Sequence, residues 1–360
     1  MGVSDISNVV AIHTSDRKMF KDCRRKWDLA SRMRRNLTPK KVNDKLWLGT
    51  GFHYALEHYY GSWNVPHNRI HPVDAFKEWA EKEVKKIRKE NRDLWDEQEE
   101  MLRQQIELGI GMLEHYYSYW KDRDKEYFVE VIETEREFEV PILTPQGNKA
   151  HAVYRGKYDG VVKDKDGFYW ILEHKTASNI STDHLPLDEQ VVSYIWAAQQ
   201  IYGFEFEGVI YNIALKKVPS KPQELKNGGL SKNKNIKTTY EVYKNALIEH
   251  YGSKENVPWE DYRDILDELK KRGNEFFWRK RLIKSQQEIQ EIGERIYLEY
   301  RDMCDPNLRI YPRPSRDCMW KCDFREVCIA MNQGADYQYM LETMYEENDW
   351  SEGANEEDEW

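Results

Sequence analysis

The sequence predicts a mixed α/β (α+β) domain in which long helices come first and a group of strands forms the centre. Three observations support this prediction. Apolar residues recur at helical spacing through the N-terminal third, β-branched and aromatic residues alternate through the centre, and helical spacing returns once between the central strands. With 360 residues, the chain can bury one large core or two smaller ones.

The N-terminal third is expected to be mostly helical. Its apolar residues repeat at i, i+3 or i+4 in three separate stretches, which is the spacing of one helix face. The expected helices are Leu46–Tyr60, Val73–Glu90 and Asp96–Trp120.

The centre is expected to form an antiparallel meander followed by a helix and a further strand. Strand-like residues fill Tyr127–Leu143 and Ala152–Lys175, and turn residues interrupt them at 145–148 and 163–167. Helical spacing returns in Asp188–Tyr202, and Glu207–Leu215 again resembles a strand. The order is therefore β-β-β-α-β.

The rest of the chain is expected to add an insertion, one more helix and a tail to a single domain that covers residues 1–340. Lys, Asn, Gly and Pro make Lys216–Thr239 a loop, and a helix follows at Trp259–Lys271, so that residues 216–275 form an inserted loop and helix. A last helix is expected at Ser285–Arg301. Residues 341–360 are expected to be a flexible acidic tail.

Charge is distributed unevenly along the chain. The net charge is −9, yet Arg17–Lys45 is strongly basic, and Glu342–Glu359 is acidic without any Lys or Arg. The negative total therefore does not exclude a DNA substrate. No apolar run reaches the roughly 20 residues that span a bilayer, and Met1–Val10 lacks the order of a secretory signal, so a cytoplasmic protein without membrane contact is expected.

Asp159, Glu173 and Lys175 are the candidate catalytic residues. An acid, any residue and a lysine also occur in sequence at Glu83–Lys85 and Glu268–Lys270, but those copies lie in helical patterns. In a strand, residues i and i+2 point to the same face, so Glu173 and Lys175 converge.

The hairpin between the second and third strands gives a second argument. A turn centred on Lys165 and Asp166 places Asp159 opposite Glu173, with Cβ atoms roughly 5 Å apart. Two carboxylates at that separation repel each other unless a divalent cation lies between them. An ordinary cross-strand salt bridge between Asp159 and Lys175 explains the same pattern, and the residues alone leave both interpretations open.

Taken together, these residues resemble the PD-(D/E)XK nuclease superfamily, and specifically its RecB-like branch with the CRISPR-associated and viral exonucleases. The resemblance covers most of residues 15–330 and rests on four short motifs in the right order. They are Gly49–Leu56, Gly156–Asp159, Glu173–Thr176 and Gln190–Tyr194. The fold that it implies is the restriction-endonuclease-like core, αβββαβ.

The resemblance also implies the roles of individual residues. Asp159, Glu173 and the backbone carbonyl of His174 would bind Mg²⁺ or Mn²⁺, and His53 would add a nitrogen ligand, which favours Mn²⁺. Gln190 and Tyr194 would face the site one turn apart and position DNA, although the polar edge of a packing helix has the same pattern.

An acidic position of the branch falls in the strand before the hairpin. Glu135 is the candidate, but Glu133, Glu137 and Glu139 alternate with it along the same strand. The register of this position stays open.

Four of the five cysteines have the arrangement of a metal or cluster site. The C-terminal three are closely spaced and the fourth lies far upstream, which resembles the iron–sulfur subset of the same branch, where a [4Fe–4S] cluster fastens the start of the chain to its end. The expected ligands are Cys23, Cys318, Cys322 and Cys328. A Cys₄ zinc site or plain buried thiols are the alternatives, and Cys304 is expected to be a free thiol, unless it replaces Cys318 as a ligand.

The function that follows is a metal-dependent DNA exonuclease of recombination, replication or repair, encoded by a bacteriophage or a cell. Arg24 and Arg25, with the Lys216–Lys237 loop, would contact DNA phosphates. The acidic tail would dock a single-strand-binding or annealing protein, or only keep the chain soluble. The rival functions are a catalytically idle iron–sulfur subunit that binds DNA or assembles a complex, and a CRISPR-adaptation nuclease.

Overall fold

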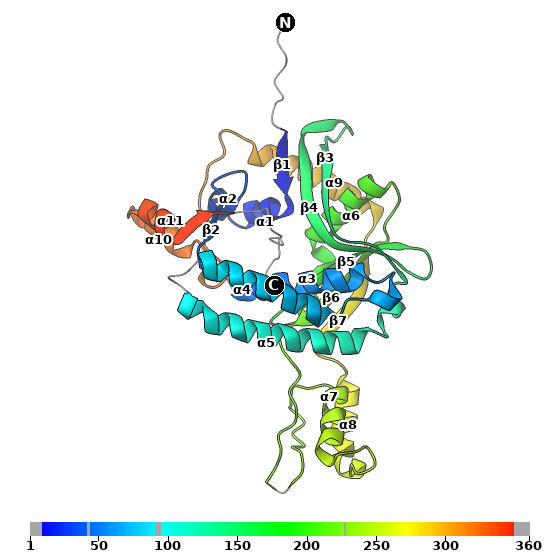
Figure 1. Cartoon of the computed structure of the whole chain (residues 1–360). Helices are drawn as coiled ribbons and strands as arrows, with labels where there is room; N and C mark the ends of the chain where they lie inside the picture. Colours follow the sequence, from blue (N-terminus) through cyan, green and yellow to red (C-terminus); the bar gives the residue numbers. More distant parts are fainter. Residues whose placement is uncertain (1–8, 42–43, 91–94, 227, 349–360) are drawn as a thin grey trace.

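A mixed sheet of six strands forms the centre of the molecule, and helices cover both of its faces (Figure 1). The computed structural model describes residues 9–41, 44–90, 95–226 and 228–348. The strand order is β1-β4-β5-β6-β7, and β3 pairs with β4 outside this path. The six strands are β1 (Val10–His13), β3 (Glu130–Leu143), β4 (Lys149–Lys163), β5 (Tyr169–Ala177), β6 (Gly208–Leu215) and β7 (Phe277–Ile283).

The predicted β-β-β-α-β order is confirmed. Strands β3, β4 and β5 form an antiparallel meander, and β6 joins β5 in parallel after the crossover helix α6 (Glu189–Tyr202). Asp188 caps this helix by accepting a hydrogen bond from the backbone of Gln190, and Gly203 ends it in the left-handed conformation. The expected α/β fold class is therefore confirmed.

The helices divide between the two faces of the sheet. The N-terminal helices pack Phe52, Phe76 and Leu113 onto Leu172 and Ile210 of the sheet. The helices of the other face meet Tyr154, Tyr158 and Tyr211. The first group comprises α3 (Asp44–Gly61), α4 (Pro72–Glu90) and α5 (Trp95–Trp120), and the second comprises α1 (Thr14–Asp22), α6 and α9 (Gln286–Met303).

Two strands of the sheet, β1 and β7, were not predicted from the sequence. Strand β1 has only four residues, too few to show alternation. Strand β7 carries Arg279, Lys280 and Arg281, and three successive cations do not show the alternation that predicts a strand. It nevertheless pairs with β6, and Arg279 is buried. Short 3₁₀ helices connect some of the longer elements in the described part of the chain, namely η1 (Pro66–Asn68), η3 (Asp124–Glu126), η4 (Leu185–Leu187) and η5 (Arg316–Met319).

The insertion forms a small unit that projects from the sheet domain (Figure 1). Helices α7 (Tyr240–Tyr251) and α8 (Trp259–Arg272) share an apolar core of their own with Leu230 of the preceding loop. The loop and α8 were expected from the sequence, whereas α7 was not. Thr239 caps α7 by accepting from the backbone of Val242.

The segment 24–39 meets the C-terminal end of the described chain on one side of the domain. Leu29 is buried with Phe324, Leu341 and Tyr345. The elements that meet there are α2 (Arg24–Ala30), β2 (Leu37–Pro39), α10 (Arg325–Gln333), α11 (Tyr337–Met344) and β8 (Tyr345–Glu347), with β2 and β8 antiparallel.

The expectation of a flexible tail from residue 341 needs correction. Residues 341–347 belong to α11 and β8, because the side chains of Leu341 and Tyr345 complete the apolar cluster. Residues 349–360 lie outside the described part of the chain. Within the described ranges, no helix has the length and apolar character needed to cross a membrane.

Candidate metal centre

Strand β4 changes partners in the middle of the sheet. On the side away from β3, its first half pairs with β1 as far as Arg155, and its second half pairs with β5 from Gly160 onward. The last β4–β5 pair is Gly160 and Leu172, so Asp159 and Glu173 are the next residues on the two separating strands. The sequence-based hairpin register is therefore confirmed.

Three side chains converge at this fork. The ligand atoms of His53 on α3, Glu135 on β3 and Asp159 on β4 all lie within 4.8 Å of one another. His53 Nδ1 is 3.2 Å from Asp159 Oδ1 and 3.9 Å from Glu135 Oε1. The structure thus brings together two of the predicted metal ligands and adds a third.

An irregularity in β3 sets Glu135 apart from the other glutamates of the strand. The β3–β4 register shifts between Val131 and Glu133, and Glu135 has a φ of +48°, a conformation that non-glycine residues seldom adopt. Its side chain is 5% exposed, against 35% for Glu133 and 52% for Glu139. The alternation of acids in the sequence could not reveal this choice, because it depends on the bulge.

Helix α3 brings His53 against the sheet. Phe52 and Leu56 on either side of it are buried in the core. Gly51 allows α4 to pack closely, because a Cβ at this position would lie 2.3 Å from the ring of Trp79. Gly51 of the expected Gly49–Leu56 motif therefore allows close helix packing, and His53 of the same motif belongs to the candidate site.

Glu173 and Lys175 lie next to this group as a buried pair. Lys175 Nζ is 2.7 Å from Glu173 Oε1, as expected for residues i and i+2 of one strand. The other carboxylate oxygen of Glu173 is buried and has no hydrogen-bond partner. Glu173 is not part of the group whose ligand atoms come within 4.8 Å, so in the described structure Glu135 lies closer to His53 and Asp159.

His174 contacts Asp159 through its backbone. Its amide donates to Asp159 Oδ2 at 2.5 Å. The imidazole ring lies in the core, stacked on Tyr60, and its Nδ1 accepts a 2.8 Å hydrogen bond from the side-chain amide of Asn212. Burial lowers the pKa of His174 to about 3, so the ring is neutral.

The pKa values of the carboxylates in the site are shifted in opposite directions. Burial raises the pKa of Glu135 to about 7, with repulsion from Asp159 adding to the effect, and Lys157 partly offsets it through an ion pair. Burial likewise raises the pKa of Glu173 to about 8, although Lys175 opposes the rise. Burial acts against ionisation of Asp159 too, but His53 holds its pKa well below the usual range.

These residues fit a divalent cation. Carboxylates that approach one another in a buried place are stabilised by a positive charge between them. The unsatisfied oxygen of Glu173 and the repulsion between Glu135 and Asp159 are the features that such an ion relieves. One imidazole and several carboxylates are ligands that Mn²⁺ and Mg²⁺ accept.

Gln190 and Tyr194 are placed on α6, near the fork but in contact with each other. Gln190 Nε2 donates to the hydroxyl of Tyr194 at 2.8 Å. The ring of Tyr194 is buried against Phe138 and Tyr158. The helix nevertheless approaches the site, since its capping residue Asp188 accepts a 2.6 Å hydrogen bond from Tyr211, the partner of Glu173 on β6.

Arg24 and Arg25 contact the C-terminal part of the chain. Arg24 lies over the ring of Tyr311, 5.1 Å from its centroid, and donates to the carbonyl of Arg309. Arg25 donates to the side chain of Asn332 at 2.7 Å and lies 3.4 Å from the sulfur of Cys328. Both arginines therefore have a structural partner within the chain.

The four cysteines with expected ligand roles lie where the chain around Cys23 approaches the C-terminal segment. Cys23 Sγ accepts from the backbone of Arg313 at 3.4 Å, and the pKa of Cys322 is raised by burial and also by the nearby thiols of Cys318 and Cys23. No three of these sulfurs come within 4.8 Å of one another among the described residues. A single tetrahedral zinc ion would hold them within ~4 Å, so the observed spacing is wider than a Cys₄ zinc site.

Comparison with known proteins gives the family. The sequence model of the PD-(D/E)XK nuclease superfamily matches residues 14–329. No curated protein matches the chain. A solved structure entitled "Crystal structure of SSO0001" is similar over 91% of this chain and 89% of its own, with 14% sequence identity and a TM-score of 0.31. This match includes the fork, the helix that carries His53 and all four candidate cysteine ligands. The chain therefore belongs to the PD-(D/E)XK nuclease superfamily.

Proposed function

We propose that the protein is a metal-dependent deoxyribonuclease that hydrolyses DNA phosphodiester bonds as an exonuclease, in recombination, replication or repair. The superfamily implies a phosphodiesterase of the nuclease type. The observation that carries the proposal is the convergence of His53, Glu135 and Asp159 beside the buried Glu173–Lys175 pair. A phage origin and the exonuclease mode rest on the resemblance alone.

The metal site that we propose uses His53, Glu135 and Asp159, with Glu173 as a further ligand. These residues would hold a Mg²⁺ or Mn²⁺ ion, which would supply Lewis-acid chemistry to the scissile phosphate and to a water. The amide of His174 holds Asp159 Oδ2, which leaves Oδ1 directed toward His53. The imidazole shifts the preference toward Mn²⁺.

Lys175 orients the attacking water in this proposal. Its ammonium group is paired with Glu173 beside the group of ligands, and an ammonium group is a donor suited to a water or a phosphate oxygen. The neighbouring Lys157, which is paired with Glu135, adds a second positive charge on the side of β3. The two lysines together favour an anionic substrate.

The direct test is cleavage of labelled DNA by the purified protein. We expect linear DNA to be degraded with Mn²⁺ or Mg²⁺ and to survive in EDTA, and we expect covalently closed circles to survive in both. Asp159→Asn should abolish degradation while DNA binding is retained. Wild-type protein that binds DNA without cutting it in either metal would instead favour the idle DNA-binding subunit.

We also propose that Cys23, Cys318, Cys322 and Cys328 hold a [4Fe–4S] cluster. Such a cluster spaces its thiolates farther apart than one zinc ion does, because iron and sulfide lie between them. The meeting of Cys23 with the C-terminal segment supports this arrangement. Brown protein with absorbance at roughly 400 nm and about four irons per chain is the expected result, and colourless protein that contains zinc would contradict it.

DNA and a protein partner complete the proposal. The basic segment that contains Arg24 and Arg25, together with the Lys216–Lys237 loop, would contact phosphates. Residues 349–360, which the structure does not describe, would dock a single-strand-binding or annealing protein. Removing residues 349–360 should then abolish capture of such a protein, and unchanged capture would dismiss the docking role.

A further inference from the structure

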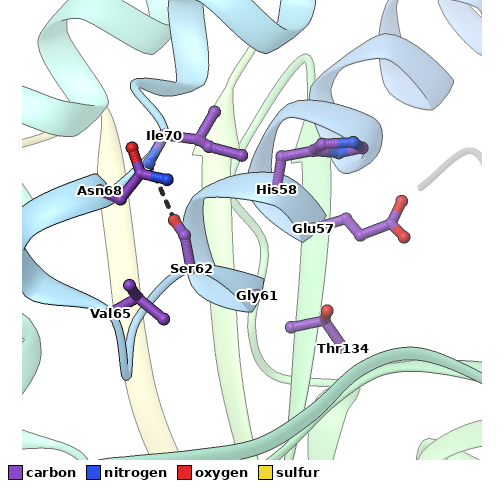
Figure 2. Close-up of a pocket in the computed structure, with 8 residues that line it drawn as sticks. All are labelled: Glu57, His58, Gly61, Ser62, Val65, Asn68, Ile70 and Thr134. Carbon is purple, nitrogen blue, oxygen red and sulfur yellow. Dashed lines mark hydrogen bonds between the residues drawn. The ribbon is translucent and has the colours of Figure 1, made fainter.

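A pocket opens beside the metal centre, at the end of helix α3. Its volume is about 390 Å³, a size suited to a small-molecule ligand. Figure 2 shows that the lining comes from α3, from the turn after it and from β3. The lining residues are Glu57, His58, Gly61, Ser62, Val65, Asn68, Ile70 and Thr134.

Residues that line the pocket are neighbours of the metal-centre residues on the same elements. Glu57 follows His53 by four residues on α3, so the two lie about 6 Å apart along the same helix face. Thr134 directly precedes Glu135 on β3. Lys157 joins the two places, because it is paired with Glu135 and attracted by the charge of Glu57.

The lining combines apolar walls with polar groups. Val65 and Ile70 are apolar side chains that are 55% and 40% exposed, and both line the pocket. Glu57, Asn68 and Thr134 supply polar atoms. A ligand that fits has flat apolar faces and a hydrogen-bonding edge, which describes a nucleobase.

Two of the polar groups accept hydrogen bonds. The carboxylate of Glu57 only accepts. His58 Nδ1 is 2.9 Å from the carbonyl of Tyr54 and must donate to it, so in the neutral ring Nε2 is an acceptor. Two acceptors favour a base with an exocyclic amino group, such as cytosine, over thymine, whose O4 would be repelled.

We propose that this pocket binds the base of the nucleotide next to the scissile phosphate, with a preference for cytosine over thymine. This inference rests on the proposed nuclease function, because the pocket adjoins the site where the phosphate would bind. Val65 and Ile70 contact the faces of the base, Glu57 and His58 accept from its amino group, and Lys157 contacts the backbone on the side of the metal.

Binding of single-stranded oligonucleotides tests the pocket. Fluorescence anisotropy in Ca²⁺ would compare strands of deoxycytidine, of thymidine and of abasic nucleotides. We expect the deoxycytidine strand to bind on the order of tenfold more tightly than the abasic strand, with the thymidine strand between them. Glu57→Gln should bring the first two strands to within about twofold of each other, because the amide can also donate.

Variants separate the pocket from other DNA contacts. Ile70→Ser alters an exposed side chain, so the fold is retained, and it should remove most of the difference between the deoxycytidine and abasic strands. Glu81→Gln on the exposed side of α4 is the matched control and should behave as the wild type. Equal affinity for the three strands, or an unchanged order of affinities in Ile70→Ser, would overturn the inference. Cutting in Mn²⁺ is scored separately, so failure of the nuclease proposal is distinguishable.

Discussion

Glu135 shares β3 with Glu133, Glu137 and Glu139, yet it alone among these four enters the group with His53 and Asp159. We therefore predict that Glu135→Gln weakens Mn²⁺ binding by at least about 10- to 100-fold, because it removes a proposed ligand and loss of even an outer-shell partner has that effect. Isothermal titration calorimetry measures this change. Glu139→Gln, on the same strand and paired with Arg155 at the surface, should bind Mn²⁺ as the wild type does.

Lys175 gives a second prediction at the scale of the residue. Lys175→Ala removes the group that orients the water in our proposal, and we expect kcat to fall by about 100- to 1,000-fold with DNA affinity nearly unchanged. Single-turnover cleavage together with a binding titration measures both quantities. Lys85→Ala is the control, since it removes the lysine of another acid-X-Lys sequence on an exposed helix. Equal loss of cutting in the two variants would contradict the assignment.

The raised pKa values of Glu135 and Glu173 predict how the metal affinity depends on pH. Both acids bind a proton in the folded protein below about 7 and about 8, respectively, and a metal ion binds their ionised forms. Metal binding therefore releases protons, and affinity should rise from pH 6 to 9. The increase in melting temperature on adding Mn²⁺ should be larger at pH 8.5 than at pH 6, and a pH-independent increase would contradict this.

The residues of the site differ in how far the sequence could reveal them. The proximity of Asp159, Glu173 and Lys175 follows from strand periodicity and one hairpin turn, which are local rules, whereas their role as a site needed the family resemblance. His53 needed the family resemblance, because a histidine in an apolar helix has no local signature. The sequence could not identify Glu135 as the glutamate that enters the site. Its position depends on a bulge and a left-handed φ, which an alternating run of acidic residues does not indicate.

At the scale of the element, strand β7 at the edge of the sheet is connected to the metal centre by hydrogen bonds through β6 and β5. Arg279 is paired with Asp124 at 2.6 Å, and both side chains are fully buried. The guanidinium also donates to Asn212 Oδ1, and Asn212 in turn donates to the ring of His174. A continuous series of hydrogen bonds therefore joins β7 to the residue whose amide holds Asp159.

We predict that Arg279→Ala destabilises the protein by about 3 kcal/mol, because the buried carboxylate of Asp124 keeps only its longer, 3.6 Å ion pair with Arg69. Urea denaturation measures this loss. Lys280→Ala changes the next, exposed residue of the same strand and should alter the free energy of unfolding by less than about 0.5 kcal/mol. Similar effects of the two substitutions would show that the buried pair contributes little.

Elements were predictable where their apolar pattern was long and uninterrupted. Helices α3 to α6 and strands β3 to β6 were expected within a few residues of their observed bounds. Strand β7 was not, because its buried cation resembles a surface residue. Helices α10 and α11 and strand β8 were missed because their apolar residues are few and are buried together with Leu29, which lies about 300 residues earlier in the chain.

At the scale of the whole molecule, the insertion is separable from the sheet domain. Strands β6 and β7 pair directly, with Ala214 opposite Phe277, so the two ends of the insertion lie side by side. Its apolar core is its own. Replacing residues 220–273 by a short Gly/Ser linker should leave the sheet domain folded, while DNA affinity falls if the lysines of the loop contact phosphates.

Circular dichroism and thermal unfolding measure the first outcome of this deletion, and anisotropy measures the second. The linker keeps Val218, which packs against α5 at Gly111. An unfolded product would show that the insertion supports the sheet. Unchanged DNA affinity would remove the loop from the DNA-binding surface.

Strand β1 has a consequence for how the protein can be shortened. Its four residues cover the backbone groups of β4 between Ala152 and Arg155. A chain that starts at Thr14 would uncover those amides and carbonyls while the rest of the sheet stays in place. Unpaired backbone groups of a strand form hydrogen bonds with other polypeptide chains. Such a shortened protein should therefore self-associate as its concentration rises, whereas the longer chain should not.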